Sequence, residues 1–130
     1  MKIKNLGIND LDLVVKLSPD SGVSLEDALY QGPWRGYGLP GKALLVMTYD
    51  VGTDLWLIHQ YASPEYRGLK AKQIFRECLL LFFQDTGAQE LFAKTPMELK
   101  HAVVMLRSLG FRKFGEEPGF IISILKRGEI

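Results

Sequence analysis

Residues 63–75 read SPEYRGLKAKQIF, and they decide how the rest of the chain is interpreted. A proline, an arginine and a glycine lead into a helix whose first backbone N–H groups are free to bind an anion. A pyrophosphate can approach such groups closely only where side chains are small, yet the chain places Lys70 and Lys72 after Gly68. The stretch therefore resembles a phosphate-binding turn in which lysines replace small residues.

The residues that follow Gly68 predict a long, buried helix. Apolar side chains recur at intervals of three and four positions, as on the buried face of an amphipathic helix. Gly87 is placed to end the helix. The apolar positions are Ala71, Ile74, Phe75, Cys78, Leu79 and Phe82.

Two apolar segments precede this stretch and predict an antiparallel hairpin. They read KALLVMTYD from residue 42 and LWLIHQYA from residue 55, and VGTD forms the turn between them. Downstream, ELFAK at 90–94 predicts a short buried strand. Thr95, Pro96 and Glu98 then form a capping-box pattern that predicts a helix ending at Gly110.

The ends of the chain complete the expected architecture. Segments 111–116 and 120–126 predict two strands, and 2–6 a short first strand. We expect a helix after Asn9 or Asp10, a second over 24–30, and a Gly- and Pro-rich loop over 31–41 with at most a small irregular strand around Tyr37. The result is one α/β (α+β) domain over residues 1–130, a mixed sheet of about six strands flanked by about four helices.

Composition narrows the functional classes. The chain has 130 residues, 47% of them apolar, and a formal charge of +1, which argues against specific nucleic-acid binding. Cys78, His59 and His101 are its only cysteine and histidines, so we expect no metal site and no disulfide within the chain. The sequence shows no signal peptide and no apolar run of membrane-spanning length, so we expect a protein that is neither secreted by its own signal nor transmembrane.

The element order, the segment ASPEYRG and the segment HAVVMLRSLGFRKFGE together resemble the GNAT superfamily of N-acetyltransferases, over roughly residues 42–126. The resemblance implies a mostly antiparallel mixed sheet and a turn whose amides hold the pyrophosphate of acetyl-CoA. In the family this turn begins with Arg or Gln and has small residues at the third and fifth positions after it. When the motif is aligned on Arg67, these two positions fall on Lys70 and Lys72. The family's frequent acid, a tyrosine, falls on Leu106, and the asparagine that often opens this helix falls on Leu99.

If acetyl-CoA is bound, the resemblance assigns its phosphates to Arg67, Gly68, Lys70, Ala71 and Lys72. The cations could also be a solvated helix end, and we favour this interpretation because a side chain at each former small position crowds the approach to the amides. No cofactor is then expected.

His59 is the one candidate catalytic residue, because it lies on the strand where a family member can place a base. A lone histidine in a strand is more often packed and hydrogen-bonded than catalytic.

Trp34, Arg35 and Tyr37 form the candidate partner-binding surface. These residue types anchor protein interfaces, and they lie here in the expected loop. The alternative is that Trp34 folds back onto the core.

A narrower resemblance favours association over catalysis. The segment GLKAKQIFRECLLLF resembles the small virion and head-assembly proteins of tailed bacteriophages that carry a GNAT-like fold. It implies a structural protein of the virion or host cytoplasm whose partners are other phage proteins or copies of itself. The alternative is an acetyl-CoA-dependent N-acetyltransferase with an altered pyrophosphate-binding motif.

Overall fold

The hairpin that precedes residues 63–75 forms as its sequence predicts. The computed structural model describes residues 2–7, 10, 29 and 32–130. Strand β3 (Ala43–Asp50) and strand β4 (Leu55–Ala62) pair antiparallel along their whole length. The Asp50 carboxylate closes the turn between them by accepting hydrogen bonds from Gly52 N at 3.0 Å and Thr53 Oγ1 at 2.9 Å.

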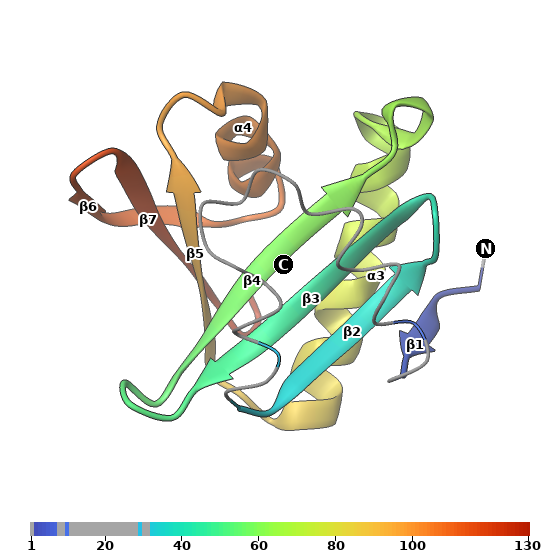
Figure 1. Cartoon of the computed structure of the whole chain (residues 1–130), viewed down its shortest axis with the longest axis horizontal. Helices are drawn as coiled ribbons and strands as arrows, with labels where there is room; N and C mark the ends of the chain where they lie inside the picture. The colour runs from blue at the N-terminus through green and yellow to red at the C-terminus, as the bar shows by residue number, and fades with distance from the viewer. Residues whose placement is uncertain (1, 8–9, 11–28, 30–31) are drawn as a thin grey trace.

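Five further strands extend this hairpin into one sheet. They are β1 (Lys4–Leu6), β2 (Trp34–Leu39), β5 (Glu90–Pro96), β6 (Arg112–Glu117) and β7 (Phe120–Lys126). The order is β1-β2-β3-β4-β5-β7-β6, and neighbours are antiparallel except β4 and β5. These two are parallel and share a single paired position, Leu57↔Phe92, beyond which they move apart (Figure 1).

Helix α3 (Leu69–Thr86) is the long helix that the apolar spacing predicts. It covers one face of β2 and β3 (Figure 1). Gly87 ends it in the left-handed conformation, with φ 67°, and donates its N–H to Phe83 O at 3.1 Å. Its buried side chains are Ala71, Ile74, Phe75, Cys78, Leu79, Phe82 and Phe83.

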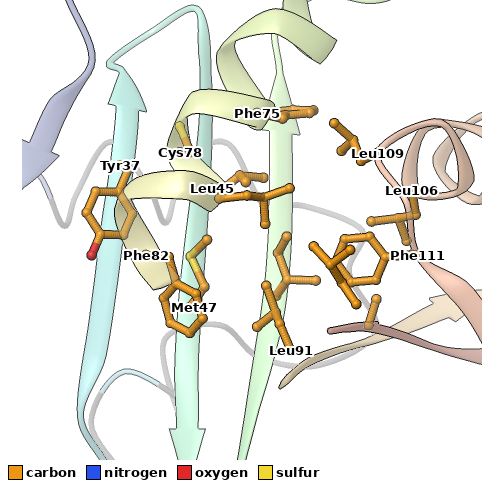
Figure 2. Close-up of a cluster of buried hydrophobic side chains, with 14 of the residues drawn as sticks. Tyr37, Leu45, Met47, Phe75, Cys78, Phe82, Leu91, Leu106, Leu109 and Phe111 are labelled. Atoms are coloured by element: carbon orange, nitrogen blue, oxygen red, sulfur yellow. The ribbon is translucent and has the colours of Figure 1, made fainter. Parts of the chain in front are cut away.

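Helix α4 (Lys100–Ser108) is joined to α3 through the same core. Leu106 is only 2% exposed, and Leu109 and Phe111 follow it into the core. Figure 2 shows these three side chains gathered on the α4 side of the cluster, with Phe75 of α3 close to Leu109. One apolar core therefore holds both helices on one side of the sheet.

The predicted capping box before α4 is wrong. Thr95 and Pro96 belong to β5, because they pair with Ile121 and Phe120 of β7. The helix begins after Leu99, which makes no side-chain capping bond. Pairing with β7 therefore extends β5 over residues whose local pattern favours a helix start.

The predicted loop over 31–41 is also wrong for most of its length. Residues Trp34–Leu39 form β2, which pairs with β1 on one side and β3 on the other. Two glycines make this close approach possible. A Cβ at Gly36 would lie 2.9 Å from Leu6 Cβ, and one at Gly38 would lie 2.5 Å from Ala43 O. These glycines reflect tight strand packing rather than a flexible loop.

The mixed, mostly antiparallel α+β architecture is confirmed. The described residues form seven strands, two α-helices and the 3₁₀ turn η2 (Pro64–Tyr66), against about six strands and four helices expected. The helices expected after Asn9 or Asp10 and over 24–30 lie largely outside the described residues. Within those residues, no helix has the length and apolar character needed to cross a membrane.

Leu106 provides a direct test of this core. We expect Leu106→Ala to lower the free energy of unfolding by about 2–5 kcal/mol, because it empties a fully buried site. Val104→Ala is the matched control, since Val104 lies on the same helix and is 62% exposed. Urea unfolding of both variants measures the difference, and equal losses would contradict the assigned burial.

Candidate functional site

The junction between β4 and α3 is built around Gly68. Here φ is 83° and ψ is −135°, a conformation that residues with a Cβ rarely adopt. A Cβ at this position would meet nothing within 4 Å. Glycine is therefore required by the backbone conformation and not by lack of space, and its Cα faces an open region.

The first backbone N–H groups of α3 are available to a ligand. The first helical hydrogen bond runs from Lys72 N to Gly68 O at 3.0 Å, so the amides of Leu69, Lys70 and Ala71 have no acceptor within the helix. No side chain caps this end, and the first turn contains no acidic residue. The helix dipole therefore leaves a partial positive charge at the junction.

Cationic side chains surround this end of α3. Arg67 and Lys70 are exposed and Lys72 is half-buried. Lys42, which precedes β3, lies at the same end of the hairpin, since Ser63 N donates to Lys42 O at 2.7 Å. We call Lys42, Arg67, Lys70 and Lys72 the basic cluster.

Tyr66 brings two members of the basic cluster together. The ammonium groups of Lys42 and Lys70 each lie 5.6 Å from the centroid of its ring, within the range of a cation–π contact. Lys42 was absent from the sequence prediction. The register could have revealed it, because the full pairing of β3 with β4 places the residue before β3 beside the residue after β4.

Ser63 also lies at this junction with an unused hydroxyl. Its Oγ is buried and has no hydrogen-bond partner among the described residues. A buried hydroxyl without a partner is costly. Free amides, four cations and an unused hydroxyl form a donor set suited to a phosphate group, so the junction fits the phosphates of a nucleotide cofactor in charge and hydrogen-bonding capacity.

The edge of β4 leads directly to this donor set. β4 has β3 on one side, but beyond Leu57 it has no strand partner on the other in the described parts of the chain. Gln60 Nε2 reaches across to Ala102 O of α4 at 3.4 Å. An extended ligand that carries amide groups could pair with this free edge as an added strand would.

Leu106 does not contribute to a reactive site. It is buried in the core below α4, and its side chain cannot donate a proton. Leu99 stands before α4 and likewise offers no polar group. The two positions that the family resemblance associates with substrate chemistry are therefore apolar here.

His59 is packed and hydrogen-bonded, as a lone strand histidine usually is. Its Nε2 lies 3.1 Å from Thr48 Oγ1, and the tautomer decides which group donates. Burial lowers the pKa of His59 to about 4, so the imidazole is neutral at pH 7. His59 alternates with Ile58, which packs in the α3 core, so its side chain lies on the opposite face of the sheet.

Trp34, Arg35 and Tyr37 do not form the outward-reaching loop that was predicted. Tyr37 is only 1% exposed and donates from its hydroxyl to Asp85 Oδ2 of α3 at 2.9 Å. Burial raises the pKa of this hydroxyl above its usual range. Of the three, only Arg35 is exposed. Trp34 packs against a second cluster of buried apolar side chains, which consists of Leu6, Leu29, Leu44, Val46 and Tyr61. A strand sends neighbouring side chains to opposite faces, so these three cannot act as one surface.

Cys78 is a buried residue of the apolar core. Burial raises the pKa of the Cys78 thiol to about 12, as expected for a core residue. No group of three histidine, cysteine or acidic side chains in this part of the chain is arranged to hold a metal ion.

The fold is that of the GNAT N-acetyltransferases, and solved structures show it along almost the whole chain. The structure of the N-acetyltransferase PseH of Campylobacter jejuni is 18% identical, with a TM-score of 0.68 and 98% of each chain covered. PseH has also been solved in complex with acetyl coenzyme A, at 17% identity. No family model and no curated protein matches the sequence.

Two further solved structures have the same fold. Spermidine N-acetyltransferase of Vibrio cholerae, in complex with CoA and spermine, is 12% identical with a TM-score of 0.68, covering 98% of this chain and 96% of that one. The protein smu.2055 of Streptococcus mutans is 14% identical with a TM-score of 0.69, covering 97% and 99%. Identities this low establish the fold alone.

His59 leads to a prediction about pH. Its pKa is about 4 in the folded chain, against an ordinary value of 6.5, so the unfolded chain binds the additional proton between these values. Stability from this group is complete above about pH 6.5 and is lost as the pH falls toward 4. We expect a loss of about 1–3 kcal/mol, discounted for the partial exposure of the ring.

Urea unfolding between pH 7 and pH 4 measures this loss. His59→Gln should flatten the dependence, whereas His101→Gln, which alters an exposed histidine, should leave it unchanged. A steep acid dependence that persists in His59→Gln would show that other groups cause it.

Proposed function

We propose that the chain is an acetyl-CoA-dependent N-acetyltransferase whose phosphate site relies on lysine side chains. The observation that carries the proposal is the placement of three free amides at the end of the open edge of β4. An extended, amide-bearing chain that ends in a pyrophosphate matches both parts of this arrangement. Acetyl-CoA has this composition, and when bound it supplies an acetyl group activated as a thioester.

The residues of the junction have distinct tasks in this proposal. The amides of Leu69, Lys70 and Ala71 would hold phosphate oxygens, and Gly68 supplies the conformation that exposes them. The cations would add attraction that small residues cannot provide. The ammonium group of Lys70 contacts the ring of Tyr66, so its side chain lies beside the helix end. A lysine at this position therefore does not have to cover the backbone amides.

Proton transfer would not depend on a strong acid or base in this chain. Leu106 cannot donate a proton, and His59, with its pKa near 4, is a weak base on the opposite face from α3. The amine substrate would therefore lose its proton to water. We therefore expect the rate to rise with pH until the amine itself is deprotonated, as the nucleophile must be neutral to attack.

A second candidate function rests on the same apolar replacements. Leu106 is buried in the core and Leu99 is apolar at positions where the family resemblance expects substrate chemistry, and this favours a GNAT-fold protein that works through association. In this form of the proposal the chain is a virion or head-assembly protein of a tailed phage, with other phage proteins or further copies of itself as partners. The fold is compatible with both functions, so cofactor binding has to separate them.

Titration with acetyl-CoA, followed by calorimetry, is the deciding measurement. We expect saturable binding that weakens as salt is raised, because much of the attraction comes from exposed charges. Lys70→Ala and Lys72→Ala should each weaken binding by about two- to fivefold, the usual scale for one exposed ion pair.

Arg76→Ala is the matched control, since Arg76 is an exposed cation further along α3. It should leave the affinity unchanged. Absence of saturable binding by the parent protein would end the enzyme proposal and leave association, which is then measured as incorporation into phage particles.

A further inference from the structure

Strand β6 forms one free edge of the sheet. It pairs with β7 on one side, and no strand of the described part of the chain lies on its other side (Figure 1). All its residues are exposed except Gly115, which is half-buried. Phe114 is 66% exposed, although its ring contacts that of Phe92 at a centroid distance of 5.4 Å. The outer backbone groups of β6 are therefore accessible to a further strand.

The charges of β6 are arranged in two blocks. The strand reads RKFGEE, so it begins with Arg112 and Lys113 and ends with Glu116 and Glu117. A second copy of β6 that runs antiparallel presents the same blocks in reverse order. Arg112 then lies opposite Glu117 of the second copy, and Lys113 lies opposite its Glu116. Opposite charges across two strands stabilise their pairing, whereas like charges oppose it, so the strand is complementary to itself.

A β-bulge lies at the centre of β6. Lys113 pairs with Ser123 of β7 and Gly115 pairs with Ile122, so Phe114 is an extra residue between two successive ladder positions. Side chains alternate along a regular strand, and positions three or five apart therefore lie on opposite faces. The extra residue reverses this rule for positions on either side of the bulge, which then share a face.

The bulge places each of the charge pairs on a single face of the sheet. Arg112 and Glu117 share one face, and Lys113 and Glu116 share the other. The ion pair that Lys113 and Glu116 form within the chain agrees with this assignment. A second copy has its bulge at the same place, so residues 113–116 of one chain face the same four residues of the other. Both charge pairs can therefore stay in register along the whole strand.

The charged side chains of β6 have partners within the chain, but these contacts are exposed. The ion pairs are Lys113–Glu116, Arg112–Glu129 and Lys94–Glu117, and their side chains remain 30–68% exposed. Exposed ion pairs contribute little to stability, so exchanging them for pairs between two chains costs little. The charges would mainly select the register, while the backbone hydrogen bonds of the added strand pair supply affinity.

We propose that two copies of the chain associate by antiparallel pairing of their β6 strands, which joins their sheets into one. The order of the charge blocks and the position of the bulge favour a second copy as the partner. The inference does not depend on acetyl transfer, because β5 and β7 separate β6 from β4 and the basic cluster.

Sedimentation equilibrium of the full chain tests this association. One added strand pair forms a small interface, so we expect a dissociation constant between about 1 μM and 1 mM. Lys113→Glu and Glu116→Lys each place like charges opposite one another twice in the dimer. Each should weaken self-association by about tenfold. A parent protein that stays monomeric up to about 1 mM would overturn the proposal.

Mixing these two variants separates the contact between chains from the ion pair within one chain. In a mixed dimer, a glutamate of one variant lies opposite a lysine of the other at both positions, so the mixture should associate about as tightly as the parent. The ion pair within the chain is lost in both variants, and mixing cannot restore it. Circular dichroism confirms that each variant is folded. If the mixture associates no better than either variant alone, the proposed pairing is wrong.

Introduced cysteines determine the register. Arg112→Cys and Glu117→Cys in a mixture place two thiols on directly opposite residues, about 4.5–5.5 Å apart at Cα, so copper-catalysed oxidation should link the chains. Either variant alone separates its two introduced cysteines by roughly 13 Å along the strand and should not form the link. The parent is the control, since its Cys78 is buried. Equal yields from the mixture and from either variant alone would contradict the register.

Discussion

The burial of one face of α3 against the sheet is the contact on which the other features depend. Phe75, Cys78 and Phe82 are all at most 2% exposed, and they fix the helix over β2 and β3. The same core extends to α4 and to β5, so the two halves of the sheet are joined by side chains where β4 and β5 share only one paired position. The edge of β4 can therefore remain unpaired beside the start of α3, because the shared core holds the two halves of the sheet together.

Much of this arrangement could be predicted from local sequence. Apolar spacing from Ala71 to Phe82 gave α3, Gly87 gave its end, and the VGTD turn gave the β3–β4 hairpin. These signals work because the residues that form each element lie close together in the chain. The errors arose where a distant strand decided the outcome. Pairing with β7 drew Thr95 and Pro96 into β5, and pairing with β1 and β3 turned a glycine-rich segment into β2.

The candidate site was predictable in part for the same reason. Arg67, Lys70 and Lys72 follow Gly68 directly, so one segment places them together. Lys42 reaches them only through the strand register, which pairs segments that lie apart in the chain. Trp34 and Tyr37 were misassigned because residue type alone does not reveal which face of a strand a side chain occupies.

The formal charge of +1 conceals how the charges are distributed along β4. Lys42, Arg67, Lys70 and Lys72 gather at its carboxyl end, with Glu65 as an acidic neighbour. Asp54 and Glu90 lie at its other end, where Glu90 pairs with Lys126 of β7. The two ends are roughly 20 Å apart, whereas salt screens charges over about 8 Å under physiological conditions. Charges at one end are therefore largely screened from those at the other, and a formal charge of +1 is compatible with a local basic cluster.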